Sequence, residues 1–144
     1  NPYTGILSIF STLIKNNKPI NIFEDGKESR DFVYIDDVVK ATALGIEKED
    51  ANGEIFNVGT GVAVTVSEVA SLLVELYGIE VPLQVTGNYR LGDIRHNYAD
   101  TTKIEKLLSF KPSFDFKTGL KRFTNWVSKY EDSIYEMKSK GLLK

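Results

Sequence analysis

The sequence contains no cysteine and only one histidine, His96, among its 144 residues. A chain without cysteine cannot form a disulfide framework, and one histidine leaves too few nitrogen and sulfur ligands for a zinc site. No uncharged apolar run approaches the length needed to cross a bilayer, and no signal peptide is visible, so a cytoplasmic location is expected. The formal net charge of -2 gives no indication of a nucleic-acid partner.

What the sequence does contain is the composition of a globular domain, with 42% apolar and 26% charged residues. Its length fits a single domain with one core, over residues 1–144. The chain begins Asn1-Pro2-Tyr3-Thr4-Gly5, without a methionine, and enters an apolar helical pattern at once. We therefore expect a piece of a longer protein, with a frayed tail over about residues 138–144.

Hydrophobic periodicity and turn signals predict short strands interleaved with helices. Helices are expected over residues 3–15, 37–47, 66–77 and 100–108, and again around Leu120, Phe123 and Trp126. Strands are expected over residues 20–23, 31–35, 54–59 and 82–86, with the third one buried. Thr65 and Glu68 match a capping box, and Asp36-Asp37 stand where an N-cap would be. The predicted fold class is α/β, mixed rather than a complete doubly wound sheet.

Two arginine-bearing segments, residues 29–37 (SRDFVYIDD) and 90–96 (RLGDIRH), give the clearest indication of a binding site. Each sets an arginine close to an acidic residue and to the predicted end of a strand or helix. Arginine binds planar oxyanions bidentately and keeps its charge, so Arg30 and Arg90 together would form a fork for a diphosphate. The alternative is that they are unrelated surface charges of little energetic consequence.

Three other features favour structural roles over chemical ones. Gly59-Thr60-Gly61 follows a predicted strand as a dinucleotide-binding loop would, but Val64 replaces the third glycine and the next helix starts too late. Asp36 and Asp37 are adjacent at a helix start and do not face each other, which favours capping over acid–base work. His96 has no serine or cysteine nucleophile pattern beside it and is expected to be structural.

Five motifs, taken in their order along the chain, resemble the C-terminal half of extended short-chain dehydrogenases/reductases that act on nucleotide sugars. They are residues 22–26 (IFEDG), 30–38 (RDFVYIDDV), 56–61 (FNVGTG), 65–68 (TVSE), and 90–96 together with Ala99-Asp100. Together they cover nearly the whole chain and are specific to the family, though not to one substrate. The first residues, NPYTGIL, are most similar to the 4-epimerases of that family.

The resemblance implies a role in substrate binding for several residues. Arg30 and Arg90 would grip the substrate diphosphate, and Asp93 would hold the nucleotide ribose. Phe23 would line the pyrimidine base, where an aromatic ring can stack on it. Two residues at the start of the first helix would also lie near the nucleotide: Thr4 and Gly5.

The resemblance also implies what the chain does not supply. The family's N-terminal half carries a glycine-rich NAD loop and a Tyr-x-x-x-Lys catalytic pair, and neither pattern occurs here; Tyr135, with Lys138 three residues on, comes closest. No residue is therefore expected to be catalytic or to bind a metal. NAD would be bound mainly by the absent N-terminal half, and the complete enzyme would be a homodimer acting on a UDP- or dTDP-linked sugar.

The function implied is binding of the nucleoside diphosphate within an NAD-dependent sugar 4-epimerase, which oxidises the sugar at C4 and returns hydride to its opposite face. The chain alone would be inactive. Two alternatives stay open: a 4,6-dehydratase or decarboxylase of the same superfamily, and a non-catalytic nucleotide-binding module. A reading frame that continues upstream through a cofactor domain would exclude the module.

The resemblance finally implies an interface with the missing half. Residues 55–58 would add a strand to its Rossmann-type sheet, and the helix over residues 37–47 would pack against it. Without that half, Val38, Val39 and Leu44 are expected to form an exposed apolar patch, and the stability of the chain alone is expected to be marginal.

Overall fold

The computed structural model describes residues 5–139, in which helices and short strands alternate along the chain. The helices are α1 (Ile6–Lys15), α2 (Ile35–Glu47), the short 3-10 helix η1 (Glu49–Ala51), α3 (Val66–Tyr77), α4 (Thr102–Leu108) and α5 (Phe116–Ser139). The strands are β1 (Ile20–Ile22), β2 (Ser29–Arg30), β3 (Val64–Thr65), β4 (Leu83–Val85) and β5 (His96–Asn97). The predicted mixed α/β class is confirmed.

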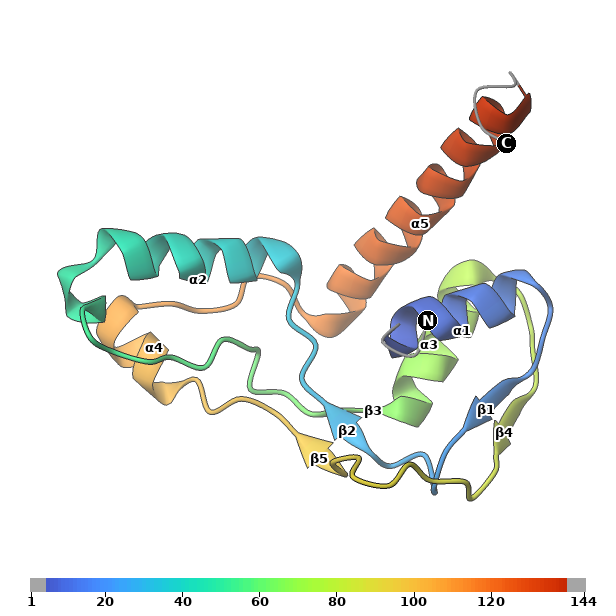
Figure 1. Ribbon diagram of the computed structural model, residues 1–144, viewed down its shortest axis with the longest axis horizontal. Coiled ribbons are helices and arrows are strands. Elements are labelled where there is room, and N and C mark those ends of the chain that lie inside the picture. The colour runs from blue at the N-terminus through green and yellow to red at the C-terminus, as the bar shows by residue number, and fades with distance from the viewer. Residues whose placement is uncertain (1–4, 140–144) are drawn as a thin grey trace.

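The strands form two small sheets rather than one. In the first sheet, β1 pairs in parallel with β4, with Ile20 opposite Leu83 and Ile22 opposite Val85. In the second, β2 lies between β3, which is antiparallel to it, and β5, which is parallel to it. The loop from β1 to β2 therefore runs beside the loop from β4 to β5, along the lower edge of the molecule in Figure 1.

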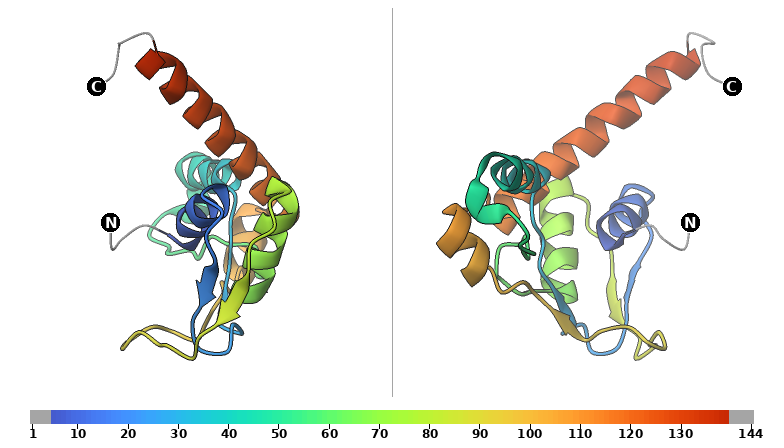
Figure 2. Two further views of the ribbon diagram at one scale, coloured as in Figure 1. Left: turned by 90° about the vertical axis from the view of Figure 1, so that its right-hand side faces the viewer. Right: turned by 60° about the vertical axis from the view of Figure 1, so that its left-hand side comes forward.

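Two hydrophobic clusters hold these elements together. The larger one joins α1, α3, β1 and the start of α5, and its buried members are Phe10, Ile14, Ile20, Ile22, Val64, Val69, Ala70, Leu73 and Leu120. The smaller one joins α2 and α4 through Ala41, Ile104, Leu108 and Phe110. Figure 1 shows the corresponding two groups of helices on opposite sides of β2, and Figure 2 shows α5 projecting away from both.

Local signals placed the ends of α3 correctly. The Thr65 side chain accepts a hydrogen bond from the Glu68 N–H, and the Glu68 carboxylate accepts one from the Thr65 N–H, so the predicted capping box is formed. At the other end Gly78 adopts the left-handed conformation that ends a helix, with φ of 63°. The helix expected from Asp100 begins two residues later: α4 starts at Thr102 with Thr101 as its N-cap, and the Asp100 carboxylate accepts the Thr102 N–H at 3.0 Å from outside the helix.

The predicted strand over residues 31–35 is wrong, and so is the predicted N-cap. Strand β2 ends at Arg30, and α2 starts at Ile35 with Tyr34 as its N-cap. Asp36 and Asp37 lie in the first turn, where their charge still suits the helix dipole. Asp37 is buried, and its carboxylate accepts the backbone N–H groups of Ser113 and Phe114. It thus tethers a distant loop, which explains why it does not cap its own helix.

Residues 54–59 do not form the predicted buried strand. The segment is extended and alternates as a strand would, with Phe56 and Val58 half-buried against the smaller cluster. No strand of the described residues pairs with it, and Ile55 is 86% exposed.

The apolar face of α2 also differs from the expected one: Ile35, Val39 and Ile46 are exposed. Two of the expected members, Val38 and Leu44, are half-buried because they turn inward, and Leu44 packs on the smaller cluster.

The predictions for the two chain ends have different outcomes. Helix α1 begins at Ile6, with Gly5 as its N-cap, so its described start lies three residues after the predicted one. Helix α5 continues through residues 138 and 139, the start of the expected frayed tail, and residues 140–144 lie outside the described part of the chain.

One carboxylate, that of Asp31, ties the two sides of the molecule together. It accepts hydrogen bonds from the Thr60 N–H at 2.9 Å, the Thr60 hydroxyl at 2.6 Å, the Gly61 N–H at 2.9 Å and the Ala99 N–H at 3.2 Å. Partial burial opposes ionisation of Asp31, but the hydrogen bonds from Thr60, Gly61 and Ala99 outweigh it and hold its pKa below the usual value.

Asp31→Asn is expected to lower the free energy of unfolding at pH 7 by about 1–3 kcal/mol, because an amide nitrogen would face N–H donors in place of an acceptor oxygen. A group whose pKa is lowered by folding contributes stability above its unfolded pKa of about 3.9 and loses it as pH falls through the folded value. Chemical denaturation at several pH values should therefore give a constant wild-type advantage from pH 5 to 7 that shrinks below about pH 4.

The exposed Asp50→Asn substitution is the matched control, since it removes the same charge from the 3-10 helix η1. We expect that control to change stability by less than about 0.5 kcal/mol. An Asp31→Asn protein as stable as the wild type at pH 7 would contradict the role given to this carboxylate.

Candidate functional site

The loops at residues 23–28 and 86–95 run side by side and carry most of the residues expected to bind a ligand. Backbone hydrogen bonds join them at three places: Thr86 N–H to the Ile22 carbonyl, Glu24 N–H to the Asn88 carbonyl, and Ser29 N–H to the Arg95 carbonyl. The distances are 2.9, 2.7 and 2.9 Å. The loops are thus extensions of the two strand pairings, which fix their relative position.

Arg30, at the end of β2, meets Asp93 on the second loop. The Nη2 of Arg30 lies 2.7 Å from Oδ1 of Asp93, and its Nη1 donates to the carbonyls of Ser29 and Arg95 at 2.8 and 3.2 Å. The side chains are 30% and 47% exposed, so the guanidinium is anchored along one edge and still open to solvent. A fixed, solvent-facing guanidinium of this kind suits an oxyanion ligand.

Arg90 and Phe23 form the second pair. The guanidinium carbon of Arg90 lies 5.2 Å from the centre of the Phe23 ring, within the range of a cation–π contact. Phe23 directly follows β1 and is half-buried, while Arg90 is exposed on the opposite loop. The pair places a cation and an aromatic ring next to one another, as a ligand with both a phosphate and a base requires.

Of the remaining two predicted residues, the structure describes only Gly5. Gly5 is the N-cap of α1, and a Cβ atom added to it would meet no atom within 4 Å. Figures 1 and 2 show the start of α1 standing apart from the two loops. Thr4 lies outside the described residues. The structure therefore groups Phe23, Arg30, Arg90 and Asp93, and it leaves Gly5 separate from them.

The features given structural roles have structural partners. The N–H groups of Thr60 and Gly61 donate to Asp31, so they do not point outward as the N–H groups of a dinucleotide loop would. His96 lies in β5, with Nδ1 2.9 Å from the Ser29 hydroxyl. Among residues 5–139, no group of three or more His, Asp and Glu side chains is placed to hold a metal ion, and no helix has the length and hydropathy of a membrane span.

Sequence reasoning missed Arg95, which faces the opposite loop. Its Nη1 lies 2.6 Å from Oε2 of Glu24, and its Nη2 lies 2.7 Å from Oδ2 of Asp25. The hydrogen bond from Arg95, with a further one from the Lys27 N–H, lowers the pKa of the Asp25 carboxyl. The acidic pair Glu24-Asp25 is visible in the sequence, but nothing there indicates which arginine meets it.

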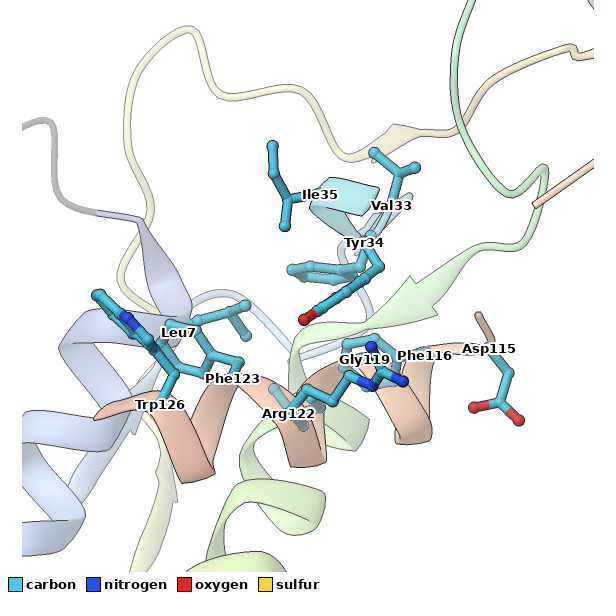
Figure 3. Close-up of a pocket in the computed structure, with 12 residues that line it drawn as sticks. Leu7, Val33, Tyr34, Ile35, Asp115, Phe116, Gly119, Arg122, Phe123 and Trp126 are labelled. Atoms are coloured by element: carbon cyan, nitrogen blue, oxygen red, sulfur yellow. The ribbon is translucent and has the colours of Figure 1, made fainter. Parts of the chain in front are cut away.

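An aromatic cavity of about 370 Å³ lies in a different place, between α1, the start of α2 and α5 (Figure 3). The Arg122 guanidinium lies over the rings of Tyr34 and Phe114, 5.5 and 4.4 Å from their centres, and 3.5 Å from the Asp36 carboxylate. Trp126 lines the same cavity and is 61% exposed. Its walls are mainly apolar and carry one guanidinium, that of Arg122, so the cavity offers a diphosphate less positive charge than the two loops and β2 do.

Comparison with known proteins gives a consistent result. Residues 1–59 match the NAD dependent epimerase/dehydratase family. A dTDP-L-rhamnose 4-epimerase from Burkholderia thailandensis is 35% identical over 132 residues, which are 92% of this chain and 36% of that protein. A UDP-N-acetyl-alpha-D-glucosaminuronate decarboxylase from Bacillus cytotoxicus is 28% identical over 91% of this chain and 42% of its own length.

Solved structures agree. The crystal structure of UDP-glucose 4-epimerase with UDP-glucose from Thermotoga maritima superposes with a TM-score of 0.79 at 35% identity, covering 90% of this chain and 42% of that one. The chain thus spans about two fifths of the length of the relatives that it matches.

Proposed function

Because this chain is related to the NAD dependent epimerase/dehydratase family, we propose that it forms the substrate-binding, C-terminal portion of a nucleotide-sugar 4-epimerase. The observation that carries the proposal is the grouping of Phe23, Arg90 and Asp93, on two adjoining loops, with Arg30 at the end of β2. Over the whole protein, the activity would be NAD-dependent inversion at C4 of a UDP- or dTDP-linked sugar. Such an enzyme would act in the cytoplasm as a homodimer.

Each grouped residue has a place in such a site. Arg30 and Arg90 would bind the diphosphate, since two permanent positive charges offset the charge of a pyrophosphate. Phe23 would stack against the pyrimidine base, and Asp93 would accept hydrogen bonds from ribose hydroxyls. Gly5, with open space above it, and Thr4 stay candidates for contact with the nucleotide at the start of α1. Binding energy from the nucleotide would then hold the sugar at the reaction centre.

We assign no catalytic residue and no cofactor loop within this chain. The N–H groups of Thr60 and Gly61 are engaged by Asp31, so the glycines at residues 59–61 do not fit the pyrophosphate of NAD. NAD would be bound mainly by another, N-terminal portion of the protein. Product analysis with the complete gene product separates a 4-epimerase from a dehydratase or decarboxylase, because only the epimerase returns a sugar of unchanged composition.

The exposed apolar residues support an interface with that N-terminal portion. Ile35, Val39 and Ile46 line one side of α2, and Ile55 protrudes from the extended segment at residues 54–58. An extended segment without a strand partner has free backbone groups that can pair with the edge of a sheet. We propose that residues 55–58 and the outer face of α2 pack against the sheet of the cofactor-binding portion.

Calorimetric titration with UDP and with dTDP tests the binding site. The complete gene product should bind one of them saturably, and the Arg30→Ala, Arg90→Ala double variant should bind it at least about a hundredfold more weakly, because each charge-assisted hydrogen bond contributes about 1.5–3 kcal/mol.

The control for this titration is the Lys103→Ala, Lys117→Ala double variant. It also removes two positive charges, but from ion pairs with Glu54 and Glu75 elsewhere on the surface. Equal losses in the two double variants would mean that net charge, rather than a site, governs binding. A folded wild type that binds neither nucleotide would overturn the proposal.

Hydrophobic-dye fluorescence and stability measurements test the interface. The chain of residues 1–144 should bind the dye, and Val39→Ser with Ile46→Ser should reduce that signal at little cost in stability. In the complete gene product the same pair should cost about 2–4 kcal/mol, because both side chains would be buried there. The exposed Val62→Ser substitution serves as the control in both forms. If the Val39→Ser, Ile46→Ser pair lowered stability by the same small amount in residues 1–144 and in the complete gene product, the proposed interface would be contradicted.

A further inference from the structure

A third guanidinium, that of Arg95, crosses between the two loops and pairs with carboxylates on the opposite loop. Its two terminal nitrogens lie 2.6 Å from Glu24 and 2.7 Å from Asp25, so each already has a carboxylate partner. The strands leading into these loops are only two or three residues long. A contact between the loops therefore affects their relative position more than a contact on a rigid element would.

The side chain of Arg95 holds a residue in an unfavourable backbone conformation. Glu24 has φ of 46°, in the left-handed region that costs a non-glycine residue energy. Its N–H donates to the Asn88 carbonyl at 2.7 Å, while its carboxylate binds Arg95, so both ends of Glu24 are attached to the opposite loop. Glu24 directly follows Phe23, whose carbonyl accepts the Gly26 N–H at 3.0 Å, so Phe23 is the first residue of this turn.

The backbone of Arg95 holds the other end of the site. Its carbonyl accepts the Ser29 N–H at 2.9 Å and Nη1 of Arg30 at 3.2 Å. Arg95 thus contacts two parts of the site. Its side chain binds the turn that begins at Phe23, and its carbonyl binds the anchored edge of Arg30. Substitution of the side chain leaves the carbonyl in place, so the two contributions can be separated by experiment.

We propose that Arg95 is a positioning residue that fixes Phe23 under Arg90, so that the base and the diphosphate of a nucleotide meet a preformed arrangement. The inference rests on the proposed function and extends it to a residue outside the predicted ligand contacts. Preformed contacts raise affinity because less conformational freedom is lost on binding. A solvated ion pair without this role would change binding little.

Arg95 also offsets the negative charge of Glu24 and Asp25 close to the proposed diphosphate site. Loss of its side chain would free the turn and expose two carboxylates to the ligand, and both changes would weaken binding. A triple variant separates them: Arg95→Ala, Glu24→Gln and Asp25→Asn together remove the contact without leaving uncompensated charge. Inorganic pyrophosphate is a second probe, because it engages the arginines but not the ring of Phe23.

The test is calorimetric titration of the complete gene product with UDP (dTDP if the wild type prefers it) and with pyrophosphate. We expect Arg95→Ala to weaken nucleotide binding about tenfold, within the coupling range of contacting residues. The triple variant should stay about as weak for the nucleotide and bind pyrophosphate within about twofold of the wild type. The nucleotide affinity of Arg95→Lys should lie between those of the wild type and Arg95→Ala, since one ammonium replaces a planar fork.

Lys117→Ala is the matched control, as it breaks an exposed ion pair with Glu75 elsewhere, and it should bind like the wild type. If the wild type binds no nucleotide, the proposed function fails. If the wild type binds and Arg95→Ala binds equally well, only this inference fails, as it does if the triple variant recovers wild-type affinity. Thermal unfolding confirms that each variant is folded; where Arg95→Ala is not, Arg95→Lys carries the test, because it keeps the charge but cannot bind both carboxylates with a planar fork, and nucleotide binding equal to the wild type would then overturn the inference.

Discussion

The carboxylate of Asp31 joins three segments that are far apart in the sequence and lie between the two hydrophobic clusters. Its partners, Thr60, Gly61 and Ala99, belong to the extended segment before β3 and to the chain after β5. Gly59 makes this possible: a Cβ atom at that position would lie 2.5 Å from Oδ2 of Asp31 and 2.6 Å from Cβ of Ala99. Since neither cluster extends across this region, a hydrogen-bonded anion takes the place of hydrophobic contacts.

The ion pairs of the candidate site depend on this framework and do not create it. Arg30 with Asp93, and Arg95 with Glu24 and Asp25, are partly exposed, and solvent-exposed pairs of this kind add little to stability. Backbone hydrogen bonds between the loops, which continue the strand pairings, place the side chains within reach of each other. The ion pairs therefore select one arrangement among those that the backbone allows, which is a matter of specificity rather than of stability.

Signals contained within a few residues predicted the structure well, and signals that depend on distant partners did not. The capping box at Thr65 and the left-handed Gly78 each lie within one turn of an end of α3, so the local sequence is sufficient to place both ends. The carboxylate of Asp37 was expected to cap α2, but its partners are 76 and 77 residues away. In the site, arginine chemistry indicated Arg30 and Arg90 and the family resemblance indicated Asp93, whereas the contact of Arg95 with Glu24 follows only from the fold.

The geometry of the site finally depends on the register of β2 against β5. Ser29 lies opposite His96 and Arg30 opposite Asn97, which brings Asp93 and Arg95 alongside the β1–β2 loop. A shift of one residue would turn the side chains of β5 to the other face and separate these pairs. Two paired residues are too few to fix a register by themselves. The Asp31 N–H donates to the Asn97 carbonyl, and the Asp31 carboxylate accepts the Ala99 N–H. The residue that joins the two sides of the molecule thereby also sets the alignment on which the candidate site depends.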